Sequence, residues 1–359
     1  MDFSQLDHFL KERKEPAYRL GQIRHAFYID LAENWDQVTV LSKPLREACK
    51  EAFPWDPFSV IRVQESKEGD TVKSLLSCID GQKIEAVLMH HADERDTVSV
   101  SSQAGCAMAC TFCATGTMGL KRNLTADEIV SQVIHYARWL KPRGRRVTNV
   151  VLMGMGEPFH NYDEVMKALR ILNDPNGFNL GARRMSISTC GIVPGILRLA
   201  DEPMQVNLAI SLHSAIDAKR SRIMPVNRAY SLSKLRQAVF TYMEKTNRKV
   251  LFEYLLLKGI NDGEEDARAL AEWLGDDKRL IHVNIIKYHE TEAFQGTERA
   301  SRIQFLHRLL QLGVPATHRI TFGEDIDAAC GQLAVKEDQA GTVQGLQAVR
   351  ANKQHTPTA

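Results

Sequence analysis

The stretch that decides the fold is Cys106–Cys113, which reads CAMACTFC and places three cysteines within eight residues. Three residues separate Cys106 from Cys110, and two separate Cys110 from Cys113. This spacing is too tight for a disulfide framework, but it lets one short loop surround a metal centre with three thiolates.

Three thiolates leave one position on the metal centre open. A structural zinc site is closed by four protein ligands, whereas thiolates hold the individual irons of an iron–sulfur cluster. Three of four irons would be bound here, and the fourth could bind a small molecule. The loop therefore predicts a 4Fe-4S cluster on Cys106, Cys110 and Cys113. A zinc site and three buried, reduced cysteines are the alternatives.

Further motifs extend this pattern along the chain. With Phe112 before the last cysteine, CX3CX2C resembles the signature of radical S-adenosylmethionine (SAM) enzymes. Together with the motifs that follow, it resembles the RlmN/Cfr family, which methylates an adenine ring carbon in RNA. The similarity runs from about Lys83 to Leu333. The additional motifs are CATGTMGLKRNLTADEIV from Cys113, GMGEP from Gly154, SLH from Ser211 and DIDAACGQL from Asp325.

The bulk properties suit an enzyme of the cytoplasm. A length of 359 residues predicts about two domains. The sequence shows no signal peptide and no apolar run near the roughly 20 residues that cross a bilayer. Seven cysteines, three of them in one loop, suit a reducing compartment. We therefore expect a cytoplasmic protein without a membrane segment.

The net charge of +2 does not by itself indicate nucleic acid. Phosphate binding needs local rather than global positive charge, although basic runs are commonly just solvated faces. The resemblance implies ribosomal or transfer RNA as the partner. The candidate cations are Lys121 and Arg122 beside the cysteine loop, then Lys141, Arg143, Arg145 and Arg146, then Arg183 and Arg184.

The pattern of apolar residues divides the chain. Over the first fifty residues they recur at three- and four-residue intervals, which predicts helices, and Pro54 and Pro57 interrupt this pattern. Alternating runs such as VKSLLSCI and KIEAVLMHH then predict a small antiparallel sheet. We expect a helical accessory domain with a β extension over residues 1–80.

From about Thr97, short apolar strands alternate with amphipathic helices. This pattern predicts βα units around a parallel sheet, and their number fits an open, partial (βα)6 barrel of the α/β class over residues 81–337. Thr125 and Glu128 form a capping box before one helix. We expect the tail, residues 338–359, to be disordered. The expected strands are TVSVSS, VTNVVLM, MSIST, QVNLAISL, VLFEYLLL, IHVNIIKY and ATHRITF.

Candidate SAM-binding residues lie where these strands end, which is where barrels place their sites. GMGEP combines two glycines with a carboxylate, although such a run is often merely a turn. The resemblance implies that Gly156 and Glu157 contact the SAM amino group. It also assigns cofactor positions to small polar groups that would otherwise be read as loop caps. These positions are Ser188, Ser211, Leu212, His213 and Asn284.

Cys330 lies among small neighbours, which would leave its sulfur accessible. The resemblance implies that one SAM methylates this cysteine and that a second yields a 5′-deoxyadenosyl radical. That radical takes a hydrogen atom from the S-methyl group, and the methylene radical then adds to the ring carbon. The resemblance makes Glu85 the acceptor of the ring proton. On composition alone, Cys330 would be a buried structural cysteine and Glu85 one exposed strand carboxylate among many.

The chain departs from the family at Ser99, seven residues before the first cysteine of the loop. The family has a second catalytic cysteine there, which forms a disulfide with the methyl carrier and frees the RNA. A serine hydroxyl forms neither a thiolate nor a disulfide. Another thiol could resolve the adduct, either Cys49, Cys78, Cys190 or a small cytosolic thiol. The enzyme could instead use different chemistry or another substrate, or have lost ring methylation.

The leading hypothesis is a radical SAM methyltransferase acting on an adenine ring carbon of ribosomal or transfer RNA through S-methylcysteine. A radical SAM enzyme with another substrate and a non-catalytic cluster protein that binds RNA are the alternatives. We further expect a monomer that receives electrons from a donor such as flavodoxin or ferredoxin.

Overall fold

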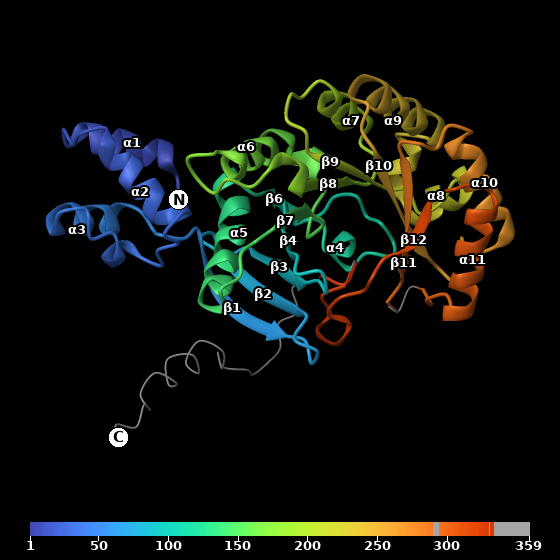
Figure 1. The fold of residues 1–359 in the computed structure, drawn as a ribbon, viewed down its shortest axis with the longest axis horizontal. Coiled ribbons are helices and arrows are strands. Elements are labelled where there is room, and N and C mark those ends of the chain that lie inside the picture. The colour runs from blue at the N-terminus through green and yellow to red at the C-terminus, as the bar shows by residue number, and fades with distance from the viewer. Residues whose placement is uncertain (290–293, 330, 334–359) are drawn as a thin grey trace.

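The computed structural model describes residues 1–289, 294–329 and 331–333. Cys330 and the tail expected to be disordered lie outside the described residues. An N-terminal group of helices stands to one side of a strongly curved sheet, whose outer face other helices cover (Figure 1).

The N-terminal helices confirm the periodicity of the first fifty residues. They are α1 (Phe3–Glu12), α2 (Tyr18–Tyr28) and α3 (Lys43–Ala52). The Asp2 carboxylate caps α1 by accepting hydrogen bonds from the backbone amides of Ser4 and Gln5. Aromatic rings fill the centre of this group, with Trp55 packed against Phe27 and Trp35. Asp56 forms an ion pair with Arg138 of the following unit, which fixes the helices beside the sheet.

Next comes an antiparallel meander of three strands, as the alternating runs predict. It consists of β1 (Phe58–Glu65), β2 (Thr71–Cys78) and β3 (Lys83–His90). β3 pairs antiparallel with β4 (Asp96–Ser99), and β4 pairs parallel with the next strand of the main sheet. The meander therefore continues directly into the barrel, and residue 80 lies in the turn between β2 and β3.

The remaining large strands run parallel, in the order β4-β7-β8-β9-β10-β11-β12. The first six alternate with helices, and β1 and β12 form the two edges, so the barrel is open. This confirms the partial (βα)6 architecture. The strands are β7 (Asn149–Leu152), β8 (Met185–Thr189), β9 (Asn207–Ser211), β10 (Val250–Leu256), β11 (Ile281–Lys287) and β12 (Ala316–His318).

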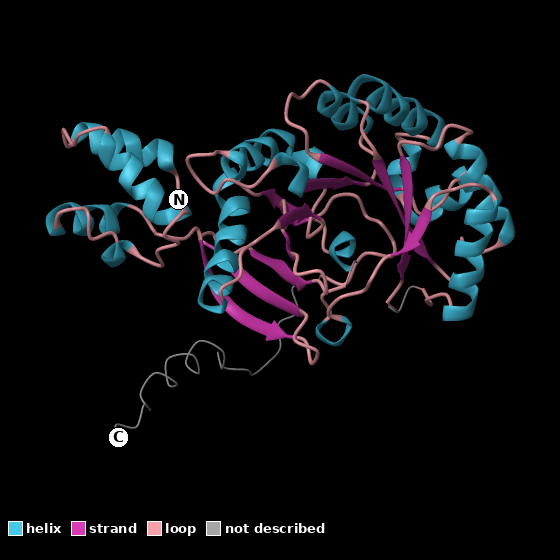
Figure 2. Ribbon diagram, viewed as in Figure 1, coloured by secondary structure: helices cyan, strands magenta, loops and turns pink. Residues whose placement is uncertain are grey.

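Helices cover the outside of this sheet, and only short elements lie inside its curve (Figure 2). The outer helices are α5 (Ala126–Leu140), α6 (Tyr162–Asn173), α7 (Val193–Ala200), α8 (Asp217–Ile223), α9 (Leu232–Thr246), α10 (Glu264–Leu274) and α11 (Arg299–Gln311). The inner elements are α4 (Ala114–Thr117) and a two-stranded ribbon of β5 (Gln103–Gly105) and β6 (Leu120–Asn123).

Helix α5 shows how the sequence fixes this layering. Thr125 and Glu128 form the predicted capping box, and the apolar stripe of the helix is buried. The Tyr136 hydroxyl contacts the Val72 and Ala86 carbonyl oxygens of β2 and β3. Those contacts place α5 on the outer face of the meander.

The opposite, inner face of the meander carries polar groups. Cross-strand partners point to the same face, and Val87 pairs with both Lys73 and Ser99. Glu85, two residues from Val87, shares that face. The loop after β12 crosses it, because Lys73 Nζ donates to the Asp327 carbonyl oxygen at 3.1 Å. The fold therefore brings Lys73, Glu85 and Ser99 beneath the segment that leads to Cys330.

Candidate active site

A cavity of about 160 Å³ lies at the carboxyl ends of the parallel strands. Cys106, Cys110 and Cys113 all line this cavity. Most of the other lining residues come later in the chain than the cysteine loop. The other walls come from the ends of β7, β8, β9 and β10. The predicted cluster loop and the predicted strand ends therefore meet at one site.

The environment of the cysteines is apolar. Cys106 and Cys110 are buried, and Cys113 is half-buried. Burial raises the pKa of the Cys106 thiol to about 11 and raises the pKa of Cys110 further. A metal centre must displace these protons when it binds. Among the described residues, no three His, Cys, Asp or Glu side chains surround a position for a single ion. Three thiols from one loop that line one cavity fit the thiolate ligands of an iron–sulfur cluster.

The GMGEP strand end approaches the segment that precedes the cysteine loop closely. Gly156 has a φ of +103°, and a Cβ there would lie 2.6 Å from the Gln103 Cβ. At Gly154, a Cβ would lie 2.7 Å from the Val100 carbonyl carbon. Only glycine fits these two positions without displacing the backbone. The motif is thus a close contact between β7 and the segment after β4, and both glycines line the cavity.

Glu157 presents a fixed carboxylate to the cavity. Its side chain is only 3% exposed. One carboxylate oxygen accepts a hydrogen bond from the Phe159 amide at 3.0 Å, and the other accepts one from the Cys190 amide at 2.8 Å. The Glu157 amide itself donates to Gln103 Oε1 at 2.8 Å. Such a carboxylate is oriented in advance to receive an ammonium group.

Some of the other predicted cofactor residues line the cavity, and the others lie behind the residues that line it. Ser188, Ser211 and His213 line the cavity. Leu212 is fully buried and does not line it. Asn284 does not line it either, but its amide donates to Glu253 Oε1 at 2.9 Å. Asn284 therefore positions Glu253, which does line the cavity.

His213 occupies a strained and buried position. Its φ is +56°, in the left-handed region. Burial, together with the nearby Arg220, lowers the pKa of His213 to about 3, so the ring is neutral. Its Nδ1 accepts a hydrogen bond from the Leu255 amide at 3.1 Å. The ring meets Phe112 edge to face, with centroids 4.9 Å apart. His213 thus supports the cysteine loop and does not act as an acid or base.

Two charged residues of the wall were missed by the sequence reasoning. Arg319 lies 3.3 Å from Glu253 Oε2, and its other terminal nitrogen lies 3.3 Å from Met153 Sδ. Glu253 interrupts the apolar strand VLFEYLLL, and a carboxylate in such a strand is a signal that could have been noticed. The sequence offers no comparable signal for Arg319.

A buried arginine behind the wall was missed as well. Arg220 is 1% exposed, although it belongs to the polar run DAKRSR. Its guanidinium donates to the Leu212 carbonyl at 3.0 Å, the Cys190 carbonyl at 2.7 Å and Asn227 Oδ1 at 2.9 Å. It therefore joins the ends of β8 and β9, both of which carry cavity residues.

Ser101, in the run that follows Ser99, connects the meander to GMGEP. Its hydroxyl donates to the Glu85 carbonyl oxygen at 2.6 Å and accepts from the Met155 amide at 2.9 Å. Gln103 holds the Glu157 amide in the same way. Ser101 and Gln103 thus hold the GMGEP strand end in place whether or not residue 99 is a cysteine.

Glu85 is 1% exposed and is not part of the cavity wall. Its Oε1 lies 3.5 Å from Nζ of Lys73, which is 5% exposed. Burial lowers the pKa of Lys73, and the Glu85 carboxylate opposes that shift. A buried ion pair therefore lies under the loop after β12.

The residues flanking Cys330 bind the segment after the cluster cysteines. The Gly331 carbonyl accepts from the Ala114 amide at 2.8 Å, and the Leu333 carbonyl accepts from Thr115 Oγ1 at 2.6 Å. Cys330 itself lies outside the described part of the chain. Its sequence neighbours are nevertheless anchored at the cluster loop.

The cations predicted beside this loop are not equivalent. Arg122 forms ion pairs with Asp80 and with Glu128, at 2.5 and 2.7 Å. These two carboxylates raise the pKa of Arg122 and neutralise its charge. The expectation that Arg122 contacts phosphate is therefore not supported. Lys121 is exposed.

The open barrel and its three-cysteine cavity define the class of protein. Residues 100–273 match the model of the Radical SAM superfamily. In keeping with this class, a solved radical SAM methyltransferase from Sphaerobacter thermophilus shares 46% identity and superposes with a TM-score of 0.89. That match covers 92% of this chain and 97% of the solved chain.

Curated relatives identify the particular family. A probable dual-specificity RNA methyltransferase RlmN of Staphylococcus aureus strain JH9 is 46% identical over 343 residues, covering 95% of this chain and 93% of the relative. The corresponding protein of strain COL matches equally well. The chain belongs to the RlmN family of radical SAM RNA methyltransferases.

The cofactors of this family are a 4Fe-4S cluster and SAM, and the cavity fits both. Three thiols from one loop line it, and so does Glu157 from the end of β7. In the portion of the chain described here, no helix is long and apolar enough to cross a membrane.

Proposed function

We propose that this protein methylates a ring carbon of adenine in ribosomal or transfer RNA, with Cys330 carrying the methyl group as S-methylcysteine. The observation that carries this proposal is the anchoring of the segment around Cys330. Asp327, before it, is bound by Lys73 beside Glu85, and Gly331, after it, is bound by Ala114 beside the cluster cysteines. The segment that carries Cys330 is thereby held between Glu85 and the cluster cysteines, and the reaction needs all three of these groups.

Cys106, Cys110 and Cys113 would hold the cluster. Gly156 and Glu157 would receive the SAM amino group, and Ser188, Ser211 and His213 would complete the pocket, with Leu212 and Asn284 supporting it from behind. When bound, cluster and SAM supply the methyl group and the radical chemistry that activates it. The protein's own part is to orient SAM through Glu157 and to keep the cysteine loop packed on His213.

Glu85 would accept the proton from the ring carbon. Burial favours the protonated form of a carboxylate, which cannot accept a proton. The neighbouring Lys73 ammonium has the opposite effect, because it favours the ionised form. Lys73 also fixes the loop through the Asp327 carbonyl. In our proposal, Lys73 is a positioning residue that keeps the base and the methyl carrier in one place.

Release of the methylated RNA would differ from the family pattern, because Ser99 cannot form a disulfide. Ser99 lies on the same sheet face as Glu85, where a resolving cysteine would be expected. We propose that a small cellular thiol performs this step. Residues 81–337 would form the catalytic domain and residues 1–80 an accessory domain. The enzyme would work in the cytoplasm as a monomer, with electrons from a donor such as flavodoxin or ferredoxin.

The test is anaerobic reconstitution with iron and sulfide, then incubation with SAM, an electron donor such as reduced flavodoxin and a small thiol, followed by mass spectrometry of the peptide containing Cys330 and of nucleosides from added RNA. We expect S-methylation of Cys330 and a methyl group on an adenine ring carbon. Glu85→Gln should retain the S-methyl group and lose RNA methylation. If wild-type protein methylates Cys330 but leaves every RNA unmodified, the substrate is not RNA. If Cys330 stays unmethylated while SAM is bound, the proposed methyl carrier is wrong.

A further inference from the structure

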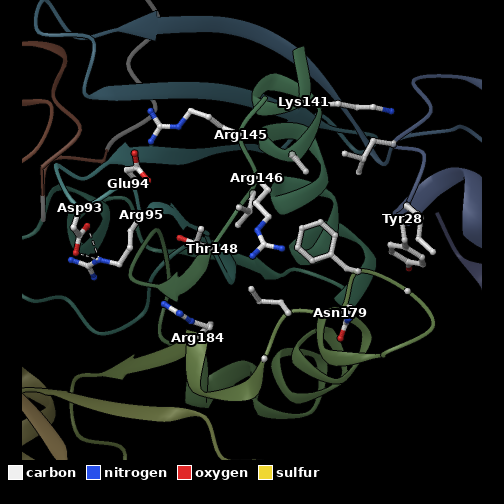
Figure 3. A pocket seen from close by; sticks show the side chains of 18 residues that line it. Tyr28, Asp93, Glu94, Arg95, Lys141, Arg145, Arg146, Thr148, Asn179 and Arg184 are labelled. Carbon is white, nitrogen blue, oxygen red and sulfur yellow. Dashed lines mark hydrogen bonds and ion pairs between the residues drawn. The ribbon is translucent and has the colours of Figure 1, made fainter. Parts of the chain in front are cut away.

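A second and larger cavity, of about 780 Å³, contains no residue of the cysteine loop (Figure 3). Its walls come from the end of α2, the turn between β3 and β4, the loop between α5 and β7, and the loop between α6 and β8. These loops precede the parallel strands. The cavity therefore lies at the amino ends of the strands, opposite to the candidate active site, at the junction with the N-terminal helices.

Most of the charged side chains that line this second cavity are cationic, and we call it the basic cavity. Five cations line it against two acidic residues, Asp93 and Glu94. Two of the cations are already paired, Arg95 with Asp93 and Arg145 with the buried Asp96. The cations are Arg95, Lys141, Arg145, Arg146 and Arg184.

The other three cations retain their charge. Arg146 and Arg184 are exposed, and neither side chain has a hydrogen bond or ion pair among the contacts that the structure describes. Lys141 donates to the Asp30 carbonyl oxygen, which does not neutralise it. Figure 3 shows Arg146 in the middle of the view, with Arg184 and Lys141 on different sides of it. An anion that enters this basic cavity would therefore meet positive charge from more than one side.

The fold links the two sites through β7. Arg146 precedes this strand and Gly154 follows it, eight positions later. At roughly 3.3 Å per residue, eight extended residues span about 26 Å, which is the upper limit of the separation between the two ends. A small substrate cannot span that distance. A folded RNA that passes around the outside of the sheet can, since roughly seven phosphates of one duplex strand already cover about 25 Å.

We propose that the basic cavity binds backbone phosphates of the substrate RNA, away from the nucleotide that is methylated. This proposal rests on the proposed function. Exposed arginines without carboxylate partners are typical of phosphate contacts, which orient a nucleic acid without reading its sequence. The basic cavity would thus make the enzyme select large, folded RNA over short fragments that contain the same target adenine.

The test compares binding of two RNAs by fluorescence anisotropy. One is a full-length transfer RNA, and the other is a short stem-loop with the target adenine, too small to reach both sites. Removing two phosphate contacts in R146A/R184A should weaken binding of the long RNA about tenfold at low salt. The slope of log K against log salt should become shallower by about 1.8. Binding of the stem-loop should not change.

The matched control is R143A/R183A. It removes the same charge at neighbouring positions that do not line the basic cavity, where Arg143 stacks on Trp139 and Arg183 bonds to Gln205. We expect a clearly smaller effect. If both double variants weaken binding equally, general surface charge is responsible and the proposal is wrong. An unchanged salt slope in R146A/R184A would overturn it as well.

A further measurement separates RNA from free phosphate. If millimolar inorganic phosphate protects the wild-type protein against heat but not R146A/R184A, and both bind long RNA equally, the cavity is a small-anion site and the proposal fails. Failure of the proposed function is distinguishable, because it would appear as absent methylation of both the full-length transfer RNA and the stem-loop by the wild-type protein. Normal methylation of that stem-loop by R146A/R184A would show that the variant is folded.

Discussion

Arg220→Met would remove the guanidinium that joins the ends of β8 and β9. The variant loses the hydrogen bonds to the Leu212 carbonyl, the Cys190 carbonyl and Asn227 Oδ1, together with a longer one of 3.4 Å to the Ser211 carbonyl. Leu212 keeps a donor, the Ser214 amide. For the Cys190 carbonyl and Asn227 Oδ1, no other donor is found among the described contacts.

Each buried acceptor left without a donor costs about 1–3 kcal/mol, so two of them cost about 2–6 kcal/mol. Part of this loss is recovered, because burial lowers the pKa of Arg220 and the charged group is itself unfavourable there. We therefore expect a net loss of about 2–3 kcal/mol in the free energy of unfolding. Arg220→Lys should be intermediate, since an ammonium keeps the charge but lacks the planar fork.

The assay is urea unfolding of the apoprotein at pH 7, with the iron content after reconstitution as a second measurement. The control is Arg222→Met in the same helix, whose exposed side chain should matter by less than about 0.5 kcal/mol. The reasoning is refuted if Arg220→Met is as stable as the Arg222→Met control. Reconstituted iron should fall in Arg220→Met, because the displaced strand ends support the cysteine loop.

Three further variants and one pH effect give direct tests. The triple Cys106, Cys110 and Cys113→Ala variant should lose its iron, whereas Cys49→Ala should keep it, and full iron in the triple variant would exclude the cluster. Gly156→Ala should weaken SAM binding in equilibrium dialysis at least tenfold, because its Cβ would lie 2.6 Å from Gln103, whereas Gly21→Ala, with open space around it, should not. Burial lowers the pKa of His213 to about 3 and that of His135 to about 4, whereas both titrate near 6.5 when unfolded. The unfolded chain then binds more protons, so stability should fall as pH drops from about 6.5 toward 4; a stability that is flat over this range would contradict the assignment. Ser99→Cys should leave less enzyme crosslinked to RNA than the native protein when no small thiol is added, and equal turnover without any adduct in either would show that this resolving step is not used.

The parts of the molecule that the sequence predicted depend on local patterns. The strands of the barrel, the Thr125 and Glu128 capping box and the grouping of three cysteines each follow from spacing within a few residues. The positions of Gly156 and Glu157 at a strand end follow for the same reason. Resemblance to a known family then supplied the roles that spacing cannot assign.

The parts that could not be predicted depend on partners distant in the chain. Arg122 looked like a phosphate contact, but Asp80, which pairs with it, lies 42 positions earlier. Arg220 looked like a surface residue, but it is buried because distant carbonyl groups converge on it. Lys73 lies next to Glu85 only because β2 and β3 pair in one register. Periodicity contains no information about such pairings.

The remaining thiols of the chain bear on how the product is released. Cys49 and Cys78 are buried, and burial raises the pKa of their thiols to about 11 and about 12. Cys190 lines the cavity, yet burial and the adjacent Glu157 raise its pKa as well. At neutral pH these thiols are protonated and react poorly with sulfur. These thiols are therefore poorly suited to the role that a cysteine at position 99 would have. In this protein, release should therefore depend on the concentration of small thiols, and a cysteine restored at position 99 should remove that dependence.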